Sequence, residues 1–136
     1  MRRATARLGL VLLVAAVVGA CATRGIVVPV TAADAELLRG RWEGGLVSQG
    51  TDGRVYFETS VTLNIQDETG RFELGTGSSW DTPVRVKDGK VLLGIDQGSR
   101  EFELRRGSDG TLRLLGSYAI KWEGWDRTNT VSLTKK

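Results

Sequence analysis

The sequence predicts an all-β fold: an eight-stranded antiparallel up-and-down barrel with a short N-terminal helix, following a cleaved signal peptide. Two observations support this prediction. After Gly40, apolar and polar residues alternate with a period of two in one segment after another, as in half-buried strands. The links between these segments are short and carry turn residues, such as Asp88-Gly89. Eight strands joined in this way are enough to close a barrel and remove its exposed edges.

The expected elements begin with a short helix. Thr31 or Asp34 is positioned to cap this helix, which runs through Leu38 and ends at Gly40. The clearest strand covers 54–66, where apolar residues alternate with polar ones: Val55, Phe57, Val61, Leu63 and Ile65. The other expected strands cover 41–48, 71–79, 83–87, 90–95, 99–106, 111–120 and 127–135. We therefore expect one domain over 34–136, with a β-sandwich of the same strands as the alternative to a barrel.

Residues 1–20 have the layout of a secretory signal peptide. Basic residues precede an apolar run over 8–18, and the small pair Gly19-Ala20 follows it. The run is shorter than the ~20 residues that a transmembrane helix needs. We expect this segment to be removed, and residues 21–33 to carry a lipid and act as an extended tether.

The end of the signal segment, Val18-Gly19-Ala20-Cys21, resembles the lipobox of bacterial lipoproteins. The resemblance implies that Cys21 is acylated as a permanent anchor, and that Ala22, in place of Asp, directs sorting to the outer membrane of a Gram-negative cell, facing the periplasm. Cys21 is the only cysteine, and an unpaired cysteine in an exported chain needs a reason that lipidation supplies. The alternative is a soluble secreted protein cleaved near Ala22, with Cys21 discarded or left as an odd thiol.

Removal of the signal peptide changes the charge balance. The full chain has 19 Lys and Arg and 16 Asp and Glu, and three arginines but no acids precede Cys21, which leaves 16 of each sign in the mature chain. Nucleic-acid binding requires a basic face, so this balance gives that class of function no support.

Gly40-Arg41-Trp42, which opens the first expected strand after the short helix, resembles the Gly-X-Trp motif of lipocalins and related small barrels. In that family the tryptophan closes one end of the barrel beneath a basic side chain from the last strand. The resemblance implies that Trp42 has this role and that Lys135, where the family more often has arginine, provides the basic side chain. The tether would enter at this closed end, so the opposite mouth would point away from the bilayer.

Up-and-down order places three tryptophans at or near the mouth: Trp80, Trp122 and Trp125. Alternation turns Arg100 and Tyr118 inward in this half of the barrel, together with Thr76 and Ser78, unless a β-bulge shifts the register. We expect a small ligand here, with Arg100 facing an anionic or carbonyl group while Tyr118 and the tryptophans stack on its body. The alternatives are a solvated rim position for Arg100 and plugging of the barrel by the tryptophans.

The chain contains no histidine, so His-based triads and His metal sites are excluded. Glu123 and Asp126 lie near aromatic residues, but glycoside hydrolysis needs a deep cleft between two facing acids, for which a small barrel has little room. We therefore expect a non-catalytic protein without cofactor or metal, whose barrel binds a small hydrophobic or amphiphilic ligand. The alternative is a cell-envelope interaction protein, an accessory subunit or periplasmic inhibitor, that acts through its Trp-rich rim loops.

Overall fold

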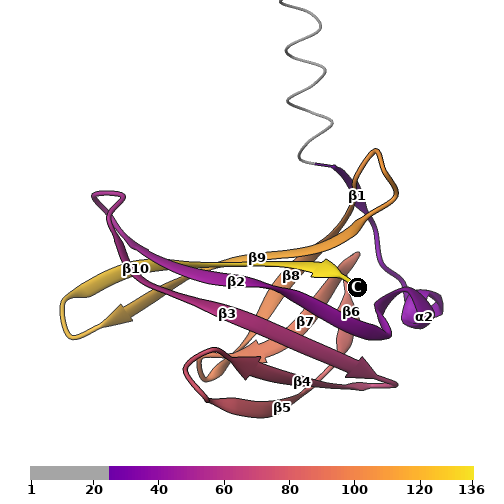
Figure 1. Ribbon diagram of the computed structural model, residues 1–136, viewed down its shortest axis with the longest axis horizontal. Coiled ribbons are helices and arrows are strands. Elements are labelled where there is room, and N and C mark those ends of the chain that lie inside the picture. Colours follow the sequence, from indigo (N-terminus) through magenta and orange to yellow (C-terminus); the bar gives the residue numbers. More distant parts are fainter. Residues whose placement is uncertain (1–24) are drawn as a thin grey trace, which may run out of the picture.

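The computed structural model describes residues 25–136, so the expected signal peptide, 1–20, and Cys21 lie outside the described residues. The described chain forms one antiparallel sheet that curls into a nearly closed barrel, with a short helical segment at one end (Figure 1). The all-β prediction is confirmed. The elements are β1 (Ile26–Val28), η1 (Ala32–Asp34), α2 (Ala35–Leu38), β2 (Gly40–Gly50), β3 (Val55–Gln66), β4 (Thr69–Leu74), β5 (Ser79–Pro83), β6 (Arg85–Lys87), β7 (Lys90–Ile95), β8 (Gly98–Arg106), β9 (Leu112–Trp122) and β10 (Trp125–Lys135).

The predicted strand count is wrong. Nine strands follow one another in the order β5-β4-β3-β2-β10-β9-β8-β7-β6, and β1 pairs with β8 off this path. The segment expected as one strand over 71–79 stops at Leu74, because the chain turns there. In this turn Gly77 donates its N–H to the Leu74 carbonyl at 2.9 Å and has a φ of +97°, a conformation that favours glycine. A new strand, β5, then begins where a loop was expected.

β5 and β6 form the bend at which the sheet closes on itself. Val84 alone separates them, and both run in the same direction because all neighbours along the path are antiparallel. β5 pairs with β4, whereas β6 pairs with β7. The stretch 79–87 is therefore one bent segment that passes from one end of the strand path to the other.

The seam between β5 and β7 has no continuous backbone ladder. Side chains close it instead. The indole N–H of Trp80 donates to the Gly94 carbonyl at 2.9 Å, and the Gly94 N–H donates to the Thr82 hydroxyl at 2.6 Å. Thr82 is buried, and the Trp80 ring packs against Phe72 with centroids 5.2 Å apart. Both backbone groups of Gly94 are satisfied in this way, as buried backbone groups require.

The helical segment and Trp42 close the opposite end from the mouth. The Asp34 carboxylate accepts hydrogen bonds from the Thr31 N–H at 2.7 Å and from its hydroxyl at 3.0 Å, which defines the start of the helical segment. Gly40 then turns the chain into β2 with a φ of +124°, which favours glycine. Trp42 is fully buried and donates its indole N–H to the Leu38 carbonyl at 2.8 Å.

Lys135 on β10 is the cross-strand partner of Trp42. Its ammonium lies 5.9 Å from the centroid of the Trp42 ring, and it donates to the Leu37 carbonyl at 2.7 Å. The last strand thus holds the helical segment against the closed end, in the arrangement that the Gly40-Arg41-Trp42 motif implies.

The beginning of the described chain is also paired with the barrel. β1 runs antiparallel to the end of β8, and the buried Val30 forms a bridge with Gly89. Residues 26–30, which we expected to belong to an extended tether, therefore lie against the closed end, and the folded unit begins before residue 34.

The barrel interior is apolar at the closed end, where the largest fully buried side chains include Trp42, Phe72 and Phe102. Three buried polar residues accompany the core, at the seam and toward the mouth: Ser48, Thr82 and Asn129. Because apolar burial is worth about 1.5–3 kcal/mol for each large side chain, this core is the main source of stability.

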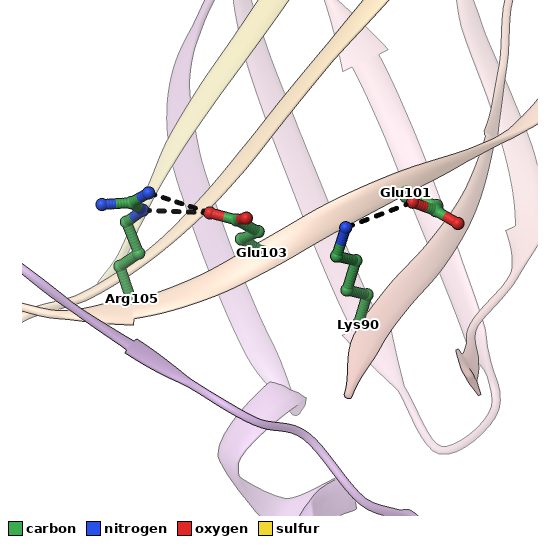
Figure 2. Close-up of polar contacts among 4 residues, drawn as sticks. All are labelled: Lys90, Glu101, Glu103 and Arg105. Atoms are coloured by element: carbon green, nitrogen blue, oxygen red, sulfur yellow. Dashed lines mark hydrogen bonds and ion pairs between the residues drawn. The ribbon is translucent and has the colours of Figure 1, made fainter. Parts of the chain in front are cut away.

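The outer face of β7 and β8 carries ion pairs (Figure 2). The Lys90 ammonium lies 3.4 Å from the Glu101 carboxylate, and the Arg105 guanidinium lies 2.9 Å from that of Glu103. Ion pairs at such solvent-accessible positions contribute about 0.2–1 kcal/mol each, so they add little to the core. They show, however, that the acids of β8 face outward.

Two hairpins, β2–β3 and β9–β10, extend at the mouth beyond the turns that join β4 to β5 and β7 to β8 (Figure 1). The pairing of β3 with β4 stops at Val61 and Leu74, and that of β9 with β8 stops at Gly116 and Phe102. The hairpin ends are therefore paired through β2 and β10, and the sheet opens on either side of them.

Candidate binding site at the barrel mouth

A row of polar side chains crosses the inner face of the sheet near the mouth. Ser48 on β2 is the cross-strand partner of Asn129 on β10, which is in turn the partner of Tyr118 on β9, and all three are buried. Arg100 on β8 continues this polar row, because it lies opposite the buried Leu93 of β7 and cross-strand partners share a face. The alternation that places Arg100 and Tyr118 on the inner face therefore holds in the structure.

Asp96 joins the polar row from the β7–β8 turn. Asp96 and Gln97 both have positive φ, +50° and +62°, as in the two-residue turns that match the twist of a hairpin. The Oδ2 atom of Asp96 accepts a hydrogen bond from the Tyr118 hydroxyl and another, at 3.2 Å, from the side-chain amide of Asn129. Burial, followed by the hydrogen bond to Asp96, raises the pKa of the Tyr118 phenol, so this hydroxyl remains a neutral donor.

Two buried atoms of the polar row have no hydrogen-bond partner among the described residues: Asn129 Oδ1 and Arg100 Nε. The Arg100 guanidinium lies over the Tyr118 ring, with Cζ 4.6 Å from the ring centroid. Buried polar groups are nearly always satisfied by protein or by water. One unused acceptor and one unused donor thus give the mouth hydrogen-bonding capacity that the protein itself does not use.

A hollow of about 690 Å³ opens beside Arg100. Its walls come from the β7–β8 turn, the start of β8 and the end of β9: Asp96, Gln97, Arg100, Ala119, Ile120 and Lys121. It lies where the backbone pairing of β8 with β9 has already stopped. Because Ile120 also packs against the buried core, the apolar interior of the barrel reaches the wall of this hollow.

A second cluster, the hairpin-tip cluster, consists of Tyr56, Trp125 and Arg127. The Arg127 guanidinium stacks on both rings, with Cζ 4.3 Å from the Tyr56 centroid and 4.4 Å from the Trp125 centroid. A β-bulge in the β2–β3 pairing places Tyr56 over Gly50, the cross-strand partner of Arg127. Tyr56 and Trp125 are 53% and 55% exposed, so the tips present aromatic surface to the solvent.

The residues predicted to contact a ligand lie in different places. Arg100 and Tyr118 are in contact in the polar row. Trp80 lines the β5–β7 seam, where its indole N–H is already bonded to the Gly94 carbonyl. Trp125 lies in the hairpin-tip cluster, and Trp122 is its backbone partner across the β9–β10 turn, although the Trp122 side chain lies outside what the structure describes.

The predicted inward orientation of Thr76 and Ser78 is wrong. Thr76 and Ser78 were expected to point into the barrel, but both are exposed in the β4–β5 turn because β4 ends at Leu74. The register slip that would have turned Arg100 outward does not occur on β8. It occurs instead between β2 and β3, where it redirects Tyr56.

Sequence reasoning missed Asn129, Tyr56 and Arg127. For Asn129 a signal was available, because it precedes Val131 and Leu133 at the spacing of one strand face and therefore occupies an inward position. For Tyr56 and Arg127 no signal was available, because the bulge that brings them together interrupts the simple alternation of β3.

Comparisons of the chain with models of known protein families, with curated proteins and with solved structures found no match. Over residues 25–136, none of the helices has the length and apolar character needed to cross a membrane. Within the same range, no group of three or more His, Cys, Asp and Glu side chains is arranged to hold a metal ion.

Proposed function

We propose that this protein is an outer-membrane lipoprotein whose lipocalin-like barrel binds a small hydrophobic or amphiphilic ligand at its mouth, without catalysing a reaction. The polar row carries this proposal, because Asn129 Oδ1 and Arg100 Nε are buried and unpaired, and Arg100 also lines a hollow. Phe57, opposite Ser48 on the inner face of β3 and 41% exposed, adds apolar surface at the same height. Apolar walls with a few convergent polar groups are typical of small-molecule sites.

The lipocalin-like part of the proposal rests on the closed end. A short helix precedes Trp42, whose ring is buried and covered by Lys135 from the last strand. The strands run up and down, and β5 and β6 together take the place of a single bent strand, which brings the barrel close to eight strands. Barrels of that size are either filled by side chains or hold one small ligand.

The lipid anchor rests on Val18-Gly19-Ala20-Cys21. β1 and the helical segment lie at the closed end, so an anchor at Cys21 holds this end toward the bilayer and leaves the mouth facing the periplasm. A Cys21→Ala variant should lose its acyl mass and move from the membrane pellet to the soluble fraction, because the acyl chains provide the binding. An Ala22→Asp variant is the matched control: it keeps the acyl mass and changes only the membrane to which the protein is sorted. Full retention of Cys21→Ala in the pellet would contradict the anchor.

Ligand binding is tested by native mass spectrometry of the intact protein purified from the membrane fraction in a neutral detergent. We expect a bound small molecule, either carried through purification or acquired on incubation with a single-chain amphiphile. A protein that carries no additional mass and acquires none from acidic or neutral amphiphiles would refute the proposed function.

The alternative is an envelope interaction protein that binds a partner through the hairpin-tip cluster. The exposure of Tyr56 and Trp125 favours it, since large aromatic side chains at projecting tips are typical of interfaces. Cross-linking in intact cells distinguishes the two functions: a partner captured by the native chain should be lost in Trp125→Ala. Ile26→Ala is the control, because Ile26 is an exposed apolar residue at the closed end.

A further inference from the structure

We propose that the ligand of the mouth is an anionic amphiphile, whose carboxylate or phosphate head contacts Arg100 and Lys121 in the hollow between β8 and β9. This inference rests on the proposed function and adds to it the charge of the ligand and the position of its head group.

Arg100 carries a charge that no ion pair compensates. Among residues 25–136, no carboxylate lies within ion-pair distance of its guanidinium, and its Nε atom is buried without an acceptor. Acids are close in sequence, but Glu101 and Glu103 of the same strand pair with Lys90 and Arg105 on the outer face (Figure 2). The alternation of β8 thus places its acids on the outer surface and Arg100 on the inner face.

Asp96 is the acid that lines the hollow with Arg100, but its carboxylate is bonded to neutral donors and forms no ion pair with Arg100. Its Oδ2 atom accepts hydrogen bonds from Tyr118 and Asn129, which draw the carboxylate toward the polar row. Tyr118 covers one face of the Arg100 guanidinium by stacking, which stabilises a cation but does not neutralise it. A partly buried charge without a counter-ion is unfavourable, and an anion from outside the protein would remove this cost.

The hollow combines cationic side chains with apolar surface. Lys121, at the end of β9 and opposite Asp126 of β10, places a second cation on its rim. Ala119 and Ile120 supply apolar surface next to the two cations. A guanidinium suits the planar, two-oxygen geometry of carboxylate and phosphate, and an apolar wall suits an alkyl chain. The site therefore matches a molecule with an acidic head and an apolar body.

The hollow lies beside a break in the backbone pairing of the barrel wall. Backbone pairing between β8 and β9 ends at Phe102 and Gly116, so the two strands are not joined by a ladder beside the hollow. The hollow therefore lies beside the point where this ladder ends, and Ile120, one of its walls, packs against the buried core. An alkyl chain can lie against Ile120 in this hollow while its acidic head stays at Arg100 and Lys121.

The test compares three probes of equal chain length: dodecanoate, dodecyl phosphate and dodecanol. Binding of each to the full-length lipidated protein is measured by native mass spectrometry from a neutral maltoside detergent. We expect at least one acidic probe to bind ten-fold more tightly than the alcohol, a difference of about 1.4 kcal/mol. Arg100→Gln should remove this preference and leave dodecanol binding unchanged, and Lys121→Gln should weaken it. Preference for the carboxylate or for the phosphate distinguishes a fatty-acid source from a phospholipid source.

Two control variants keep the result interpretable. Arg113→Gln removes an exposed arginine of the same strand pair at the closed end and should change nothing. Arg100→Lys keeps the charge without the planar fork and should retain part of the preference, which shows that Arg100→Gln acts through charge and not through loss of folding. Equal binding of all three probes, unaffected by Arg100→Gln, overturns the anionic head group while the proposed function stands. No binding of any probe overturns both.

Discussion

Replacing Thr82 by Val tests whether side chains close the barrel between β5 and β7. The Thr82 hydroxyl accepts the Gly94 N–H at 2.6 Å and donates to the Pro83 carbonyl at 3.0 Å, and Thr82 is 2% exposed. Valine has nearly the same shape but no hydroxyl, so the Gly94 N–H would lose its acceptor at a buried seam. Leaving a buried donor without a partner costs about 1–3 kcal/mol. In a domain of about this size, such a loss lowers Tm by about 4–12 °C.

The free energy of unfolding is measured by urea denaturation, and the exchange of the Gly94 amide hydrogen by NMR. In Thr82→Val we expect a lower midpoint and faster exchange of this amide, because the seam opens where the acceptor is missing. Thr130→Val is the matched control, since Thr130 is exposed on the outer face of β10. The hydroxyl does not hold the seam if the free energy of unfolding of Thr82→Val is within about 0.5 kcal/mol of that of the native chain and the Gly94 amide stays protected from exchange.

Trp80 provides a second measurement of the same seam. Trp80→Phe keeps a ring against Phe72 but removes the N–H that bonds to the Gly94 carbonyl. Because Trp80 and Thr82 bond to the two backbone groups of one residue, the double variant should show a coupling energy, whereas independent sites would simply add.

Two further predictions concern the mouth half of the barrel. Gly116→Ala should cost about 1–3 kcal/mol in urea unfolding, because a Cβ at Gly116 would lie 2.7 Å from the buried Phe102 ring; an unchanged midpoint would contradict this packing. The raised pKa of Tyr118 means that the unfolded chain releases this proton at a lower pH than the folded chain, so folding stability should decline as pH rises above about 10. Tyr118→Phe should lack this part of the decline. In Tyr56→Phe, the phenolate absorbance of Tyr118 should appear only above the pH range in which tyrosine ordinarily ionises.

The closed end was predictable because local rules act there. The residues that form it are close in sequence: Thr31, Asp34, Gly40 and Trp42. Each has a local conformational or burial preference that can be read from its residue type. Lys135 is far away in sequence, but up-and-down order places the last strand beside the first, so its position opposite Trp42 follows from topology.

The mouth was predictable only in part. Period-two alternation placed Arg100 and Tyr118 correctly, because an uninterrupted strand keeps its register. It failed at Thr76, where a turn built on Gly77 ended β4 early, and at Tyr56, where a bulge changed the register. Turns and bulges of this kind depend on which strand is the neighbour, and a sequence does not state that.

By itself, the sequence determined the class of fold, the closed end with its buried Trp42, and the expectation of an anchor at Cys21. These features depend on alternation, on local backbone preferences and on a short motif. Only the tertiary structure decided how the barrel closes and which mouth residues meet. The Gly94 seam and the contacts of Asp96 with Tyr118 and Asn129 join strands distant in the chain, and cross-strand neighbours exist only after the sheet has formed.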